Sequence, residues 1–122
     1  RHEDVNVLGA WGLDQHPAGS AGYHEIAWIP PYDIPYRTLL PKDFDNLLVA
    51  GRCHSASSVA LASSRVTATA MGMGQAAGTA AALAGSGSPR EVDLGQLQAA
   101  LRMAGVILQA PESAVEVGDP NF

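Results

Sequence analysis

The stretch from Val66 to Ala84 constrains the fold most, because it is apolar yet built mainly from Ala, Gly and Thr. It predicts a helix that begins near Arg65 and ends at Gly85, a residue type suited to the left-handed position after a last turn. Each glycine inside a helix costs about 0.5–1 kcal/mol relative to alanine. We therefore expect a backbone or a ligand to lie too close to this helix for larger side chains.

The expected start of this helix holds the only Lys, Arg, Asp or Glu side chain between Cys53 and Pro89, which is Arg65. Ser63 or Ser64 can cap the N-terminus there. A cation at that end opposes the helix macrodipole, which favours anions. Arg65 is either a surface arginine or, as we favour, part of a site in which it and the first-turn backbone N–H groups face an anion.

The same stretch approaches the roughly 20 residues needed to cross a membrane. Gly74 and Gly78 also form a GxxxG pair, which occurs at contacts between membrane helices. Its small side chains supply little transfer energy, and no aromatic or basic anchors flank it. We therefore favour a closely packed helix outside the membrane. Since no targeting segment can be recognised, the cytoplasm is the default expectation.

Length and charge narrow the class of protein. The 122 residues suffice for one small domain, and the chain opens on Arg1, so we expect it to be part of something larger. A net charge of −5 without a Lys/Arg cluster argues against nucleic-acid binding. One cysteine excludes an internal disulfide, and the histidines lack metal-ligand spacing.

Composition divides the chain into segments 1–45, 46–88 and 89–122. The first is rich in proline and aromatic residues, which predicts extended, irregular chain with a short strand within Glu25–Ile29. In the second, Leu47–Ala50 reads as a strand buried on both faces, as in a parallel sheet covered by helices.

The third segment predicts an amphipathic helix. Asp93 and Gln96 stand at capping-box spacing, and Gly105 can end the helix. One face is apolar and is expected to pack; it consists of Leu94, Leu97, Leu101 and Ala104.

Two pairs of residues are candidates for chemistry. Gly51 and Arg52 follow the expected strand, where ligands of open parallel sheets bind, although a simple turn explains them equally well. Asp14 and His16 project to one side of an extended chain and form either an acid–base pair or a loop hydrogen bond.

The order of several motifs resembles the C-terminal end of bacterial FAD-dependent oxidoreductases related to the fumarate reductase flavoprotein group. The resemblance covers roughly residues 5–108, and its combined order is more specific than any single motif. The motifs are Ile34–Pro41, Asp45–Arg52, Ser64–Val66 and Gly74–Ala82. It implies an α/β class: a C-terminal fragment of a three-layer FAD/NAD(P)-binding fold of the glutathione-reductase type, with a last parallel strand and a flavin-facing helix.

The resemblance also implies a cofactor and roles for residues. Gly51 and Arg52 match positions near the ribityl and pyrophosphate groups of FAD. Backbone N–H groups around Val66 and Thr67 would face flavin N1 and O2, and Arg65 would add positive charge or hold an anionic substrate. The reaction would be hydride transfer at flavin N5, with Arg65, Asp14 and His16 as catalytic candidates.

The family's N-terminal βαβ unit, with its Gly-rich turn, has no counterpart here. We therefore expect an N-terminal FAD-binding portion as partner, either a separate chain or a removed segment, and a small-molecule substrate on the side of Trp11–Arg37. Nucleic acid and membrane are not expected partners. The alternative is a non-enzymatic interaction module that docks through its Ala/Gly-rich helix.

Overall fold

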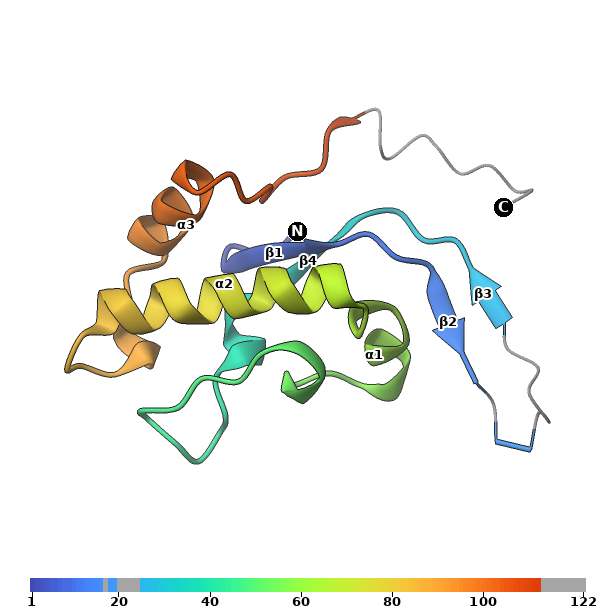
Figure 1. Cartoon of the computed structure of the whole chain (residues 1–122), viewed down its shortest axis with the longest axis horizontal. Coiled ribbons are helices and arrows are strands. Elements are labelled where there is room, and N and C mark those ends of the chain that lie inside the picture. Colours follow the sequence, from blue (N-terminus) through green and yellow to red (C-terminus); the bar gives the residue numbers. More distant parts are fainter. Residues whose placement is uncertain (17, 20–24, 113–122) are drawn as a thin grey trace.

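A computed structural model of the chain describes residues 1–16, 18–19 and 25–112. The long helix α2 (Thr67–Ala84) lies along one side of an antiparallel ribbon (Figure 1). The shorter helices α1 (Ser58–Ser64) and α3 (Leu94–Met103) lie near its two ends. Short 3₁₀ turns occur at Tyr36–Leu39, Gly51–Cys53 and Pro89–Glu91.

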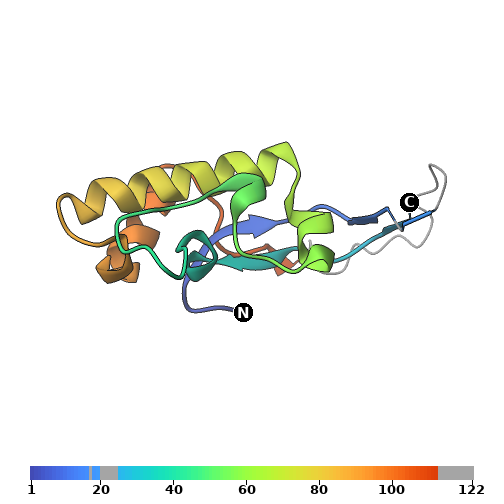
Figure 2. The same ribbon diagram turned by 90° about the horizontal axis from the view of Figure 1, so that it is seen from below.

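The ribbon has two parts that follow one another along the chain. β1 (Val5–Gly9) pairs with β4 (Tyr32–Pro35), and β2 (Leu13–Gln15) pairs with β3 (Glu25–Ala27), both antiparallel. Figure 2 shows the β2–β3 part extending beyond α1. The expected strand within 25–29 is thus confirmed as β3. The β1–β4 pair was not predicted, because its pairing joins segments far apart in the sequence and prolines flank β4.

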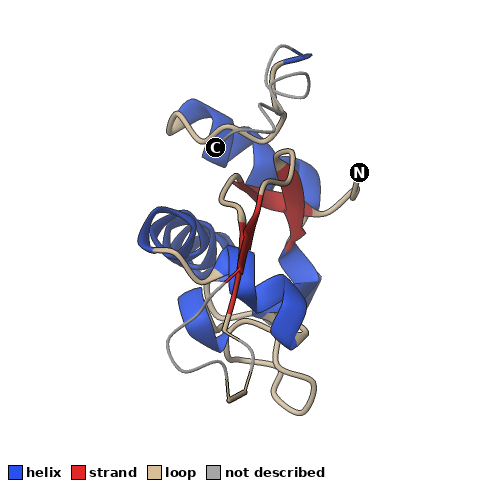
Figure 3. Ribbon diagram, turned by 90° about the vertical axis from the view of Figure 1, so that its right-hand side faces the viewer, coloured by secondary structure: helices blue, strands red, loops and turns tan. Residues whose placement is uncertain are grey.

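The predicted strand Leu47–Ala50 is wrong for this structure. Ala50 has extended dihedral angles (φ −145°, ψ 166°), but none of these residues belongs to a sheet, and Leu47 is 43% exposed. The Val49 N–H donates to the Leu39 carbonyl at 2.9 Å. In the described part of the chain, this run has no neighbouring strand to pair with. Figure 3, which looks nearly along α2, shows a narrow ribbon beside helices and no parallel layer.

The helix expected from near Arg65 is confirmed as α2, but the stretch before it, expected to be a loop, forms a separate helix, α1. Ser57 caps α1 by accepting a hydrogen bond from the Ala60 N–H at 3.2 Å, so the cap assigned to Ser63 or Ser64 is wrong. Both of those serines are buried in α1. The predicted end of the helix at Gly85 is confirmed, and Gly85 has a positive φ of 55°, although its ψ of −113° lies outside the left-handed helical region.

The core forms where α2 and α3 pack on the β1–β4 pair, and every one of the three compositional segments contributes to it. Its buried residues are Val5, Val7, Ile34, Tyr36, Leu39, Met73, Ala76, Ala80, Leu97, Leu101 and Leu108. Close approach explains one glycine of α2: a Cβ on Gly72 would lie 2.5 Å from Val7 Cγ2. At Gly74 and Gly78 no described atom lies within 4 Å of such a Cβ, so the expected tight packing does not apply to them.

α3 follows the sequence-based prediction closely. Asp93 accepts a hydrogen bond from the Gln96 N–H at 2.8 Å, and Gly105 adopts a φ of 84° after the helix. Leu97 and Leu101 are fully buried, whereas Ala104, at the C-cap, is exposed. Among the helices described, none combines the length and the apolar character required to span a membrane.

Candidate functional site

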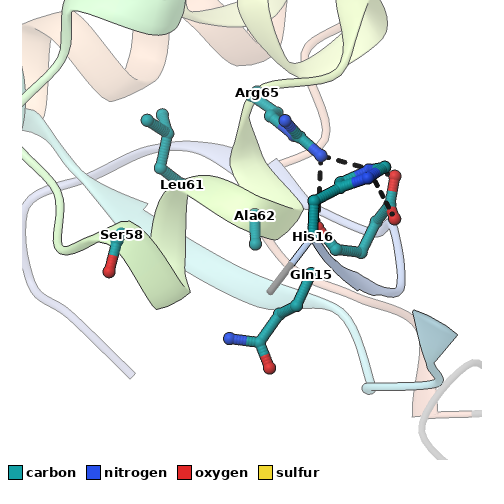
Figure 4. A pocket seen from close by; sticks show the side chains of 7 residues that line it. Gln15, His16, Ser58, Leu61, Ala62 and Arg65 are labelled. Carbon is teal, nitrogen blue, oxygen red and sulfur yellow. Dashed lines mark hydrogen bonds and ion pairs between the residues drawn. The ribbon is translucent and has the colours of Figure 1, made fainter. Parts of the chain in front are cut away.

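A pocket of about 370 Å³ lies between β2 and α1 (Figure 4). Both the ribbon and the helix contribute its walls, which are formed by Asp14, Gln15, His16, Ser58, Leu61, Ala62 and Arg65. All three predicted catalytic candidates therefore line one pocket. Four of these residues lie on α1 or at its end, and they were not recognised as a group from the sequence. They stand zero, three, four and seven positions after Ser58, a spacing that places them on one face of a helix.

Arg65 is the central cation of this pocket. Its Nη2 donates to the Asp14 carbonyl at 3.2 Å and lies 3.5 Å from Asp14 Oδ2. Arg65 stands just before α2, as predicted, but it is also the C-cap of α1, a helix that was not predicted. A cation at a C-terminus is stabilised by the helix dipole rather than opposed by it. The placement of Arg65 therefore needs no bound anion to explain it.

Asp14 connects Arg65 with the imidazole of His16. Asp14 Oδ1 lies 3.3 Å from His16 Nε2, while its other oxygen faces Arg65. The side chain of His16 is 53% exposed, so solvent and small molecules reach its ring. A carboxylate beside an accessible imidazole can orient the ring and support proton transfer. Arg65 adds hydrogen-bond donors suited to a carboxylate.

The predicted cofactor residues meet next to this pocket, at the junction of α1 and α2. Val66 is the N-cap residue of α2, and its apolar side chain accepts no hydrogen bond. The backbone N–H groups of the first turn, which begins at Thr67, are therefore not capped by Val66. Gly51 has a φ of 66°, and Arg52 Nε reaches the Arg65 carbonyl at 3.5 Å. The structure thus brings together two segments that are separated by a dozen residues.

A second, smaller cavity of about 210 Å³ adjoins the start of α2. Trp11, Val66 and Thr69 are among its lining residues. Behind it, the Tyr32 hydroxyl donates to Ser63 Oγ at 2.7 Å, and Ser63 donates to the Trp11 carbonyl at 2.6 Å. Burial raises the pKa of Tyr32, and the hydrogen bond with Ser63 partly offsets that rise. At neutral pH the Tyr32 hydroxyl therefore keeps its proton and donates to Ser63, which in turn binds the backbone at Trp11.

A family model described as FAD dependent oxidoreductase matches residues 1–101. The chain belongs to this family. The sequence-based prediction of FAD as cofactor is confirmed at the level of the family. No curated protein and no solved structure gives a significant match to the chain. The mixture of helices and small antiparallel sheets is consistent with part of the FAD-binding domain of such an oxidoreductase.

The residues at the α1–α2 junction fit the cofactor of the FAD-dependent oxidoreductases. The N-terminus of the 18-residue helix α2 lacks a side-chain cap, which suits the electronegative edge of a flavin. A side chain at Gly51 would be strained at its positive φ, and Arg52 is exposed beside it. Within the described ranges, no group of three or more His, Cys, Asp or Glu residues is arranged to hold a metal ion.

Proposed function

We propose that this chain is the C-terminal portion or subunit of an FAD-dependent oxidoreductase of the fumarate reductase-related group, with the cytoplasm as its compartment. It would complete a flavin site whose other half comes from an N-terminal FAD-binding portion. One observation carries the proposal: the uncapped start of α2 lies beside Gly51 and Arg52 and next to the pocket of Arg65, Asp14 and His16. A cofactor site and a substrate site then share one junction.

On the cofactor side, each segment has its own task. The N–H groups around Val66 and Thr67 would hold the electronegative pyrimidine edge of the flavin, and Arg65 would add positive charge nearby. Gly51 lets the backbone come close, and Arg52 donates to phosphate or sugar oxygens. When bound, FAD supplies the redox chemistry by accepting or donating a hydride at its N5 atom.

On the substrate side, the pocket combines an anchor with a proton carrier. Arg65 binds an anionic group of a small molecule, since its guanidinium donates hydrogen bonds in a planar fork. Asp14 keeps Arg65 and the imidazole of His16 in fixed relation through its two oxygens. His16 exchanges a proton with the substrate when the hydride moves.

Native mass spectrometry of the protein as isolated tests the proposal first, together with its absorption spectrum. We expect a complex heavier than the 12.6 kDa chain, with a mass increment equal to FAD. It should absorb near 450 nm, and reduction should bleach that band. A colourless monomer or a cofactor-free homo-oligomer would contradict the proposal for the protein as purified.

One observation favours the alternative of a non-enzymatic interaction module. Gly74 and Gly78 present open helix surface with no described atom within 4 Å of their Cβ positions, and the neighbouring Met71 is 70% exposed. Such a surface suits close contact with another helix. A module of this kind forms a complex that is colourless, so the same spectrum distinguishes the two functions.

A further inference from the structure

His54 is a buried titratable group that the proposed chemistry does not use. It directly follows the Gly51–Cys53 turn and is only 7% exposed, whereas the neighbouring Cys53 is exposed. Its ring makes two contacts in opposite directions. Nδ1 lies 2.6 Å from the Gly51 carbonyl oxygen, and Nε2 lies 3.1 Å from Ser64 Oγ.

These contacts determine where the ring carries its hydrogen. A carbonyl oxygen can only accept, so Nδ1 must be the donor to Gly51. Ser64 has one hydroxyl hydrogen and two acceptors within reach, His54 Nε2 and the Ala60 carbonyl at 3.0 Å. When His54 is neutral, the Ser64 hydroxyl donates to Nε2. When it is protonated, Nε2 donates to Ser64, and the hydroxyl turns to Ala60.

The two contacts join two segments that would both face the cofactor. The Gly51–Arg52 turn lies on one side of the His54 ring, and the last residue of α1, Ser64, lies on the other. Immediately after Ser64 come the residues at the start of α2. A second hydrogen bond between these segments, from Arg52 Nε to the Arg65 carbonyl, is long at 3.5 Å and exposed. The buried ring of His54 is therefore the shorter and better shielded connection.

We propose that His54 is the positioning residue that fixes the Gly51–Arg52 turn against the α1–α2 junction. This inference rests on the proposed function for its purpose, but the connection itself belongs to this chain alone. The Gly51 carbonyl accepts from His54 twice, from Nδ1 and from the backbone N–H at 3.2 Å. Both donors hold the carbonyl inside the chain and keep it from repelling an anionic group beside the turn.

Four variants separate the contacts. His54→Asn keeps a side-chain N–H near the position of Nδ1 but loses the contact with Ser64. Ser64→Ala removes the contact at Nε2, together with the hydrogen bond from Ser64 to the Ala60 carbonyl within α1, and leaves the contact at Nδ1. His54→Leu removes both contacts of the ring. Cys53→Ala is the matched control, because Cys53 belongs to the same turn and its side chain is exposed.

Nitrogen NMR and amide hydrogen exchange on the chain by itself measure the positioning directly. We expect neutral His54 to be the Nδ1–H tautomer. We expect the His54 backbone amide, which donates to Gly51, to exchange about tenfold faster in His54→Leu and within about threefold of the unaltered chain in His54→Asn. If His54→Leu does not fold, Ser64→Ala gives the comparison, with an expected change of about threefold. An Nε2–H tautomer, or equal exchange in all variants, would overturn the positioning role.

FAD affinity of the complex with the N-terminal portion provides the second readout. His54→Leu should weaken FAD binding about tenfold, with His54→Asn recovering most of the loss and Cys53→Ala unchanged. Equal FAD affinity in His54→Leu and the unaltered complex would contradict the inference. If the unaltered complex binds no FAD, the proposed function fails, whereas the tautomer and exchange data still decide whether His54 holds the turn.

Discussion

Arg65 is the residue on which both halves of the candidate site depend. It follows α1, precedes the N-cap of α2, and contacts Asp14 across the pocket. The sequence singled it out because no other Lys, Arg, Asp or Glu lies between Cys53 and Pro89. Its surroundings could not be predicted, because its partner Asp14 lies 51 residues away and no local pattern links the two.

Replacing Arg65 with alanine tests its role in the reaction. We expect Arg65→Ala to lower kcat/KM about tenfold or more, or to shift the flavin potential, because a charge-assisted contact is lost. The mass of the complex should not change, since the side chain of Arg65 is partly exposed and lies outside the core. Steady-state kinetics and a potentiometric titration measure both effects, with the exposed Arg102→Ala as control. Unchanged kinetics together with an unchanged potential would refute this role.

Tyr36 makes the stability of the fold sensitive to alkaline pH. Burial raises the pKa of Tyr36 above its ordinary value of 10.0, so the folded chain holds the phenol proton more tightly than the unfolded chain does. The resulting stability is fully present below pH 10 and is lost as the pH rises through the raised pKa. Tyr32, whose pKa is also raised, adds to the same trend.

Tyr36→Phe should therefore flatten the decline in the free energy of unfolding between pH 9 and pH 11. At neutral pH the variant should be less stable by about 1 kcal/mol, because it loses the hydrogen bond from the Tyr36 hydroxyl to the Pro89 carbonyl. Urea unfolding at several pH values measures both quantities. A decline as steep as that of the unaltered chain would show that Tyr36 does not contribute.

At the scale of helices and strands, features that depend on neighbouring residues in the sequence were predicted correctly, whereas features that depend on distant segments were not. The capping of α3 by Asp93 and the end of α2 at Gly85 depend on neighbours in sequence, and both were predicted. Helix α1 was missed because the Ser, Ala and Val residues before Arg65 resemble a loop. The run Leu47–Ala50 has the composition of a buried strand, but strand formation requires a partner that the described chain does not provide.

Two glycines of α2 should respond oppositely to alanine. Gly72→Ala should destabilise the fold by about 1–3 kcal/mol, because its Cβ would lie 2.5 Å from the stiff side chain of Val7. Gly78→Ala has open space and should stabilise the isolated chain by about 0.5–1 kcal/mol through helix propensity alone. Urea unfolding of both variants measures the difference. A stabilising Gly72→Ala would contradict the close packing of α2 on β1.

At the scale of the whole molecule, one core joins the two ends of the described chain. Leu101 on α3 is fully buried in the same cluster as Val5 and Ile34 of the ribbon. Leu101→Ala should lower the free energy of unfolding by about 2–5 kcal/mol. The amides of β1 and β4 should lose protection by the same amount, because the ribbon depends on that core. Hydrogen exchange compared with Met103→Ala, a change at a 91% exposed position of the same helix, tests this expectation. Unaltered protection of β1 would show that the ribbon folds separately.

The placement of the pocket has a consequence for how such enzymes diversify. One wall belongs to the ribbon at β2, and the other belongs to α1, which is joined to the junction proposed to face the flavin. Mutations in the part of the ribbon beyond β1 and β4 reshape the first wall while leaving the core and the junction intact. If the proposed site is correct, substitutions in this outer part of the ribbon can change which small molecule fits the pocket at little risk to the folding of the chain.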